Sequence, residues 1–310
     1  MKIYQDISNF HVKNPVITTG SFDGVHLGHL KIIHRLKEIA RQTKGESVVF
    51  TFSPHPRLIL FPGEGNLRLL TTPEEKNDLL KKAGVEHLII YPFTKEFSQL
   101  SYIEFVRDIL VGELQVKTLV VGYDHKFGKN REGDFDVLQT LSSVYNFSVE
   151  KLDVLLMDDI NISSTKIRNA LQNGNVEKAN QYLGYSFRLH GTVIEGQKLG
   201  RRIQFPTANI HASDPNNIIP AYGVYAVFVH VNRKRFRGMM NIGTRPTISN
   251  ADHRSIEVHI IDFEGDLYNK PIEIEFIKKI REEQRFGSVE ELKFQLEKDK
   301  HTVMTILDKV

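Results

Sequence analysis

The sequence of 310 residues contains no cysteine. This absence excludes disulfides, iron–sulfur clusters, thiol catalysis and cysteine-ligated zinc sites together. Long apolar runs are also missing, since none approaches the roughly 20 residues that span a bilayer. Residues 1–14 (MKIYQDISNFHVKN) lack the apolar stretch of a secretion signal. We therefore expect a cytoplasmic protein without membrane segments.

An excess of charge of one sign is missing as well. The formal net charge is +3, from 41 Lys and Arg against 38 Asp and Glu. No part of the chain is basic enough to indicate bulk binding of nucleic acid. The densest basic run, residues 233–237 (RKRFR), lies between two strand-like segments and is expected to be a solvated hairpin. Neither nucleic acid nor membrane is an expected partner.

The first half of the chain alternates strand-like with helix-like segments. Strands are expected at residues 16–19, 47–52, 86–91, 118–122 and 149–156. Helices are expected at residues 30–40, 102–111, 161–171 and 176–183. Strands separated by helices predict an α/β fold, a parallel sheet with helices on both faces. Such sheets bind ligands at the carboxyl ends of their strands.

The pattern changes after Gly184. Strand-like segments follow at residues 187–194, 223–231, 236–242, 255–263 and 272–280, and an amphipathic helix at 289–307. They predict an antiparallel barrel or sandwich closed by a C-terminal helix. We place the boundary near residues 184–187, which gives one domain of residues 1–184 and another of residues 185–310.

A glycine-rich segment, residues 19–29 (TGSFDGVHLGH), joins the first expected strand to a helix. Glycines let the backbone approach a ligand, and the helix start leaves N–H groups that suit a phosphate. His26 and His29 are three residues apart, so both can point toward one site and stabilise a phosphorus-centred transition state. Zinc ligation and helix capping are alternatives, but no further zinc ligand is evident. The other candidate nucleotide-binding residues here are Gly20, Phe22, Asp23 and Gly24.

A second segment, residues 162–168 (ISSTKIR), places hydroxyl groups at an expected helix start and a cation one turn later. Ser164, Thr165 and Arg168 could hold the β- and γ-phosphates of a nucleotide. An ordinary helix cap is the alternative, although a cap would need only one of the three hydroxyls. The chain has no Walker A loop, because Gly122 and Gly128 have the wrong spacing.

The second half contains residues 200–209 (GRRIQFPTAN), an unusual segment in a β-rich domain. Thr207 and Asn209 alternate, so both side chains can face one side of an extended segment. A hydroxyl and an amide oxygen are hard ligands that suit Mg²⁺. Gly200, with two earlier glycines, could form a loop that covers phosphates. A glycine–proline turn that enters a strand is an equally good interpretation.

Four segments of the first half resemble, in the same order, the adenylyltransferase half of bacterial bifunctional riboflavin kinase/FAD synthetases. They are GSFDGVHLGH (20–29), TFSPHP (51–56), GYDHKFGKNREG (122–133) and ISSTKIR (162–168). The second half resembles the riboflavin kinase domain of that family, a six-stranded antiparallel barrel. Its segments are GRRIQFPTAN, GMMNIGTRPT (238–247), EVH (257–259), GDLY (265–268) and IREEQRF (280–286). The resemblance covers nearly the whole chain.

This resemblance implies a Rossmann-like nucleotidyltransferase domain followed by a barrel kinase domain. It implies an enzyme that makes FMN from riboflavin and ATP, and then makes FAD from FMN and a second ATP, with Mg²⁺ at both sites. In the first half it implies that His26 and His29 engage the ATP α-phosphate and that Asp124 lies near the ribose. Pyrophosphate would be held by Ser164, Thr165 and Arg168.

In the second half the resemblance makes Thr207 and Asn209 the ligands of Mg²⁺–ATP, and Glu257 the base for the riboflavin 5′-hydroxyl. It places Gly200 and Arg201 beside the nucleotide, and Arg281 and Arg285 beside the flavin. An alternative for Glu257 is a solvent-facing strand carboxylate, because apolar residues flank it on both sides in the sequence.

Two residues depart from the family pattern. His125 stands where the family usually has Phe, which affects local packing. Gln204 stands where the family usually has Gly, and this departure is expected to weaken kinase activity if the glycine lets the backbone approach ATP.

Two other functions remain open. One is an adenylyltransferase for another phosphate acceptor with a degenerate C-terminal domain, and the presence of Thr207, Asn209 and Glu257 argues against it. The other is a flavin-binding regulator without catalysis. The two histidines and residues 162–168 argue against that, because binding alone needs no grip on pyrophosphate.

Overall fold

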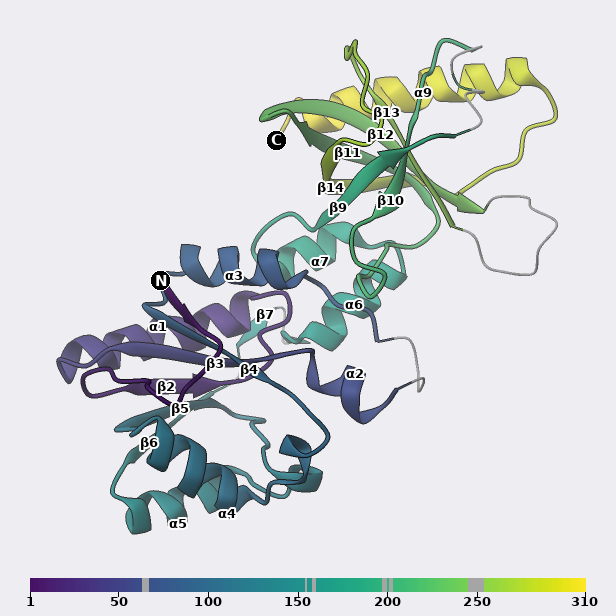
Figure 1. The fold of residues 1–310 in the computed structure, drawn as a ribbon. Helices are drawn as coiled ribbons and strands as arrows, with labels where there is room; N and C mark the ends of the chain where they lie inside the picture. Colours follow the sequence, from purple (N-terminus) through teal and green to yellow (C-terminus); the bar gives the residue numbers. More distant parts are fainter. Residues whose placement is uncertain (63–66, 154, 158–159, 197–199, 201–202, 245–253) are drawn as a thin grey trace. The chain divides into compact units, whose positions relative to one another are not determined.

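A computed structural model describes the chain except residues 63–66, 154, 158–159, 197–199, 201–202 and 245–253 (Figure 1). The chain divides into two compact units, residues 1–164 and 165–310. Arg201, a candidate nucleotide-binding residue, and residues 245–247 of the GMMNIGTRPT segment lie outside the described residues.

The first unit is built on a six-stranded parallel sheet in the order β1-β4-β3-β2-β5-β6. Its strands are β1 (Lys2–Tyr4), β2 (Val16–Thr19), β3 (Ser47–Ser53), β4 (His87–Pro92), β5 (Thr118–Gly122) and β6 (Ser148–Leu152). The order reverses at β2, because β3 pairs with one side of it and β5 with the other. The carboxyl end of β2 is therefore a topological switch point, where open parallel sheets bind ligands.

Helices cover both faces of this sheet. Val16 of β2 belongs to a core with Ile33 and Leu36, whereas the next residue, Ile17, belongs to a separate core with Leu110. This alternation explains why β2 is apolar on both faces. The elements outside the sheet are α1 (Leu27–Gln42), α2 (Pro56–Leu60), α3 (Pro73–Lys82), η1 (Phe97–Gln99), α4 (Tyr102–Glu104), η2 (Phe105–Glu113), η3 (Lys129–Arg131), α5 (Phe135–Tyr145), β7 (Leu156–Met157) and β8 (Ile160–Asn161).

The parallel sheet confirms the fold expected from the sequence, with several elements added. The sequence pattern did not predict β1, α3 or α5. β1 is only three residues long, and α3 and α5 each bury one side chain fully, Leu80 and Leu138. Helices with so narrow an apolar stripe give little periodic signal. The helix expected at residues 102–111 begins as α4 and continues as the π-helix η2.

The second unit contains a closed antiparallel barrel in the order β10-β13-β12-β11-β14-β9. The strands are β9 (Arg188–Ile194), β10 (Ala208–Ala212), β11 (Gly223–Val231), β12 (Lys234–Thr244), β13 (Arg254–Ile260) and β14 (Pro271–Arg281). The structure thus selects the barrel over the sandwich. It confirms the six strands that the family resemblance implies; the strand absent from the pattern-based list is β10, which begins inside the GRRIQFPTAN segment.

Among the residues that the structure describes, the barrel is accompanied by α6 (Ser164–Gln172), α7 (Val176–Leu183) and α9 (Val289–Leu307). The C-terminal helix α9 packs Val303 and Leu307 into one core with Phe228 and Met239 of the barrel wall. The basic run forms the β11–β12 hairpin, as expected, with Asn232 and Arg233 at positive φ in its two-residue turn.

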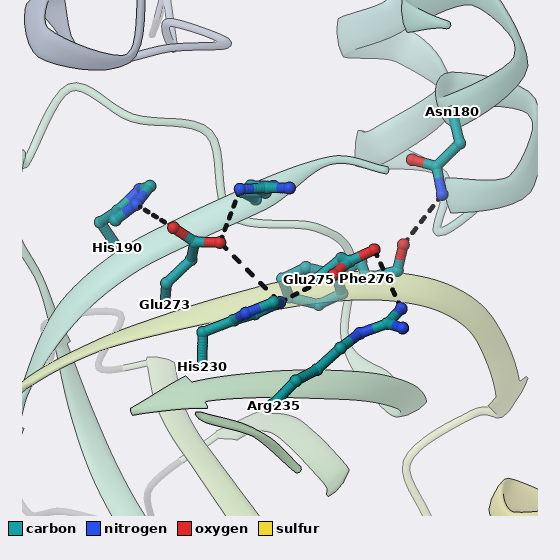
Figure 2. Close-up of polar contacts among 8 residues, drawn as sticks. Asn180, His190, His230, Arg235, Glu273, Glu275 and Phe276 are labelled. Atoms are coloured by element: carbon teal, nitrogen blue, oxygen red, sulfur yellow. Dashed lines mark hydrogen bonds and ion pairs between the residues drawn. The ribbon is translucent and has the colours of Figure 1, made fainter. Parts of the chain in front are cut away.

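Side-chain contacts fasten helix α7 to the barrel, among them an ion pair of Glu177 with Lys278 of β14 at 2.9 Å. Asn180 donates to the Phe276 carbonyl at 2.8 Å (Figure 2). It also accepts from the Phe187 backbone N–H at 2.7 Å. These bonds explain why residues 165–184 belong to the same compact unit as the barrel.

A ladder of charged side chains crosses four barrel strands. His190, Glu273, His230 and Arg235 are cross-strand neighbours on β9, β14, β11 and β12. The Glu273 carboxylate accepts from His190 at 2.8 Å, as Figure 2 shows. It also accepts from Arg188 at 2.8 Å. These partners, the His190 hydrogen bond first, hold the pKa of Glu273 below its usual range.

We expect Glu273→Gln to lower the free energy of unfolding by about 1 kcal/mol near pH 7, because it removes two charge-assisted hydrogen bonds. The pKa of Glu273 is lower in the folded than in the unfolded state, so its contribution is present above the ordinary value of 4.5 and is lost as the pH falls through the folded value. Thermal unfolding of both proteins from pH 7 to pH 3 should show the difference shrinking on acidification. The exposed Glu264→Gln is the control. A difference that stays constant over this range would contradict the assignment.

Candidate active sites

The glycine-rich segment directly follows β2 at the switch point. Its backbone is tightly bent, with Phe22, Gly24 and Val25 at positive φ. The Phe22 ring is only 2% exposed and lies against Gly20, where an added Cβ would come within 3.3 Å of it. Phe22 therefore supports the loop from the protein side.

Asp23 also faces the protein interior. Its carboxylate is 3% exposed and accepts from the backbone N–H groups of Leu70 and Thr71 at 3.0 and 3.3 Å. Its backbone carbonyl accepts from the Ser164 hydroxyl at 3.0 Å. Asp23 thus ties together three segments that are far apart in the sequence, and we assign it a supporting role.

The two histidines stand at the start of α1. His26 is the helix cap, since its Nδ1 accepts from the His29 backbone N–H at 3.3 Å. The two rings stack with centroids 3.7 Å apart. Nδ1 of His29 is buried without a hydrogen-bond partner, which capping does not explain. Among the described residues, no group of three or more His, Cys, Asp or Glu is arranged to hold a metal.

Burial lowers the pKa of His29 well below its usual 6.5, and the neighbouring His26 and Lys76 lower it further. The imidazole is therefore neutral near pH 7, with one N–H to donate and one nitrogen to accept. A neutral donor beside a helix N-terminus can hydrogen-bond a phosphate that the helix end attracts.

The loop after β5 lies at the same edge of the sheet as the glycine-rich segment after β2. Asp124 is exposed there, two residues beyond the strand. His125, the departure from the family pattern, contacts the Thr19 hydroxyl through Nε2 at 3.3 Å and stacks on Phe127. Burial lowers the pKa of His125 to about 4, so a neutral ring occupies this aromatic position.

Helix α6 begins at Ser164. Thr165 is exposed in its first turn, and Arg168, one turn along, is 9% exposed. A helix does begin within residues 162–168, as the sequence predicts. It begins at Ser164, three residues later than the expected residue 161.

The barrel brings together the polar residues that the sequence singled out. Asn209, Glu257 and Asn241 are cross-strand neighbours on β10, β13 and β12. The Thr207 hydroxyl donates to a Glu257 carboxylate oxygen at 3.2 Å. Glu257 is half-buried and accepts this hydrogen bond from an exposed threonine, and its role as a base stays a prediction. Sequence reasoning missed Asn241, whose only signal was its place in the GMMNIGTRPT segment.

Close packing shapes the loop around these residues. A Cβ on Gly196 would lie 2.0 Å from the Asn209 amide, and one on Gly200 would lie 2.1 Å from the Phe205 carbonyl. His259, on β13, donates from Nδ1 to the Pro206 carbonyl at 2.8 Å. The backbone just before Thr207 is therefore fixed to the strand that carries Glu257.

Gln204 adopts φ +70°, the left-handed conformation that favours glycine. The departure from the family pattern therefore falls at a position with a local backbone reason for glycine. The exposed side chain of Gln204 accepts from Lys293 of α9 at 3.3 Å.

We expect Gln204→Gly to raise the free energy of unfolding by roughly 0.5–1 kcal/mol, because relief of the left-handed strain outweighs the added entropy of the unfolded chain. Gln204→Ala, which loses the Lys293 contact but keeps a Cβ, is the matched control and should not gain stability. Denaturant unfolding measures both. Equal effects of Gly and Ala would mean that backbone strain is not the cause.

The segment after β14 is anchored to the C-terminal helix. Arg281 donates three hydrogen bonds of 2.7–3.1 Å to Asp299 of α9 and one to the Glu282 carbonyl. Glu283 accepts from the Thr244 backbone N–H at 3.3 Å, and Arg285 is exposed. Arg281 therefore fixes the course of this loop, and the role of Arg285 beside the flavin stays a prediction.

Comparison with known proteins covers both halves of the chain. Residues 9–166 match the FAD synthetase family model, and residues 183–307 match the riboflavin kinase model. A bifunctional riboflavin kinase/FMN adenylyltransferase of Escherichia coli is 39% identical over 97% of this chain and 96% of its own length. The Listeria monocytogenes protein of the same name is 40% identical over 96% and 94%. The chain belongs to this bifunctional family.

The fold agrees with this membership. The crystal structure of a macrolide-efflux protein from Streptococcus pneumoniae is 30% identical, covers 98% of both chains and superposes with a TM-score of 0.88. The efflux name applies to that protein. In the described part of the present chain, no helix has the length and apolar character needed to cross a membrane.

Proposed function

We propose that this enzyme phosphorylates riboflavin to FMN with ATP, and then adenylates FMN to FAD with a second ATP, releasing pyrophosphate. The observation that carries the proposal is the presence of two separately built polar sites in one chain. One is the stacked histidine pair at the switch point of the parallel sheet, and the other is the Thr207–Glu257 contact in the barrel. Incubation with riboflavin, ATP and Mg²⁺, followed by chromatography of the flavins, should show FMN and then FAD.

In the barrel, Glu257 is the base of riboflavin phosphorylation. It accepts the proton of the 5′-hydroxyl as that oxygen attacks the γ-phosphorus of ATP and ADP leaves. The Thr207 hydroxyl donates to this carboxylate at 3.2 Å and so limits its rotation. Asn241, next to Glu257 in register, supplies an amide on the other side.

Mg²⁺ fits this site by the chemistry of its donors. The Thr207 hydroxyl and the Asn209 amide oxygen are hard oxygen ligands, and cross-strand pairing sets Asn209 beside Glu257. When bound with ATP, the ion supplies positive charge to the phosphate oxygens. Gly200 and Arg201 belong to the same nucleotide loop in this proposal.

In the first unit, adenylyl transfer needs no base, because the FMN phosphate is already an anion. The site aligns that anion with the α-phosphorus of ATP and stabilises the transition state. His26 and His29 are assigned to the α-phosphate, and Asp124 to the ribose. Gly20 and Gly24 let the backbone approach the nucleotide. Pyrophosphate is the leaving group, and Ser164, Thr165 and Arg168 are assigned to bind it. The start of α6 favours negative charge there.

We further propose that the adenylyltransferase comprises residues 1–184 and the kinase residues 185–310, and that the protein is cytoplasmic. The absence of cysteine supports a reducing compartment. The boundary follows the change of pattern at Gly184, which ends α7 in the left-handed conformation.

A further inference from the structure

A lysine outside the family segments reaches the edge of the sheet where the glycine-rich segment begins. Lys76 lies on α3, and its Nζ is 3.4 Å from the Ser21 carbonyl, 3.3 Å from the Thr51 hydroxyl and 3.4 Å from the Phe52 carbonyl. Ser21 belongs to the loop after β2, and Thr51 and Phe52 belong to the C-terminal end of β3. The ammonium group therefore lies at the carboxyl ends of two adjacent parallel strands.

The surroundings of this charge are unusual for a structural lysine. All three hydrogen-bond partners are neutral, the distances are long, and no ion pair forms with Lys76 within the described residues. The nearest opposing charge that acts on it is Asp23, whose carboxylate is already held by Leu70 and Thr71. A partly buried ammonium with neutral partners costs free energy, which an arriving anion would offset.

The charge also acts on the histidine pair. Burial lowers the pKa of Lys76, and Asp23 opposes that change. In turn, Lys76 and His26 both lower the pKa of the buried His29. The charged and titratable groups that act on His29 are therefore His26 and Lys76, and Asp23 acts through Lys76. Perturbed groups that gather in this way are typical of ligand sites.

A purely structural interpretation is that Lys76 ties the glycine-rich loop to β3. A tie to the two carbonyls does not require a charge, because the two N–H groups of a neutral amide could donate to both carbonyls without the cost of burying an ammonium group.

We propose that Lys76 is a phosphate-binding residue of the adenylyltransferase site, and that its ammonium receives a phosphate of FMN or of ATP at the carboxyl ends of β2 and β3. The inference rests on the proposed function, since it assigns a residue to that reaction. It adds a cation from α3 to the group formed by the start of α1 and the carboxyl ends of β2 and β3.

The test compares three substitutions at one position. Lys76→Gln keeps a hydrogen-bond donor and loses the charge, Lys76→Met loses both, and Lys76→Arg keeps both. Lys82→Met, on the exposed side of the same helix, is the control. We expect Gln and Met to lower kcat/KM for FAD formation from FMN by about 10²-fold, the scale of losing one preorganised charged contact, and Arg to retain most activity.

Binding measurements then identify the phosphate. A fluorescence titration of FMN without ATP weakens in Lys76→Gln if the FMN phosphate is the ligand, whereas a raised KM for ATP alone identifies ATP. Either outcome supports the proposal. Riboflavin phosphorylation by the same protein should be unchanged, and a thermal unfolding curve that matches wild type shows that the unit carrying Lys76 is folded. Removal of the positive charge should also raise the pKa of His29, measured by NMR.

The outcomes separate this inference from the proposed function. If wild-type protein makes no FAD, the proposed function fails. If wild-type protein makes FAD and Lys76→Gln matches it in turnover and in both affinities, the tie to β3 is structural and the present inference is overturned.

Discussion

Replacing Glu257 by glutamine is expected to lower riboflavin turnover by about 10²–10⁴-fold, the usual contribution of a positioned general base. Glutamine keeps the size and shape of the side chain and still accepts from the Thr207 hydroxyl, so the loss isolates proton acceptance. The affinity for riboflavin and for Mg²⁺–ATP should change much less. Steady-state kinetics with riboflavin as the varied substrate separate the two effects.

The control for this experiment is Glu264→Gln, a carboxylate exposed on the loop after β13. It should phosphorylate riboflavin at the wild-type rate. Normal turnover in Glu257→Gln would rule out Glu257 as the base and return it to the role of a strand carboxylate that holds Thr207.

The second large effect is expected at His29. His29→Ala should lower FAD formation from FMN by about 10²-fold or more, the cost of removing one preorganised donor to a phosphorus-centred transition state. The reason lies in its surroundings, where the ring stacks on His26 and carries a buried nitrogen without a partner. FMN formation should be unchanged. His34→Ala is the matched control, since His34 is an exposed histidine on the same helix.

Rates of FAD formation from supplied FMN measure this effect directly. If His29→Ala and His34→Ala reduce the rate equally, the loss comes from a weakened α1, and His29 has no special part in the chemistry.

The sequence predicted both architectures, because strong periodic signals carry them. Thr118–Gly122 and Gly223–Val231 were expected as strands with the bounds that the structure shows. β10 was missed because it starts within a segment interpreted through its polar residues. The helix α3 was missed because its sequence buries only Leu80 fully, yet this helix carries Lys76.

The candidate sites were predictable in part. Thr207, Asn209 and Glu257 come together because antiparallel pairing sets β10 beside β13. Alternation along the extended segment that contains Thr207 and Asn209 had already predicted that these two share one side. The glycine pattern did not predict that the side chains of Phe22 and Asp23 are buried. For Asp23, burial depends on hydrogen bonds from residues 70–71, which are distant in the sequence.

The hydrogen-bond partner of Arg281 was also not predictable from the sequence. A motif that follows the family order does not reveal that α9 supplies Asp299 as the partner of this guanidinium. Tertiary partners of a motif residue come from segments that its own sequence does not specify.

The central claim is that two reactions take place at two separate sites of one chain. The most direct test assays two variants, Glu257→Gln and His29→Ala, each with riboflavin and with FMN as the starting flavin. The account predicts that Glu257→Gln converts FMN to FAD but leaves riboflavin unchanged, and that His29→Ala converts riboflavin to FMN and stops there. Loss of both reactions in either variant, with the protein folded, would contradict it.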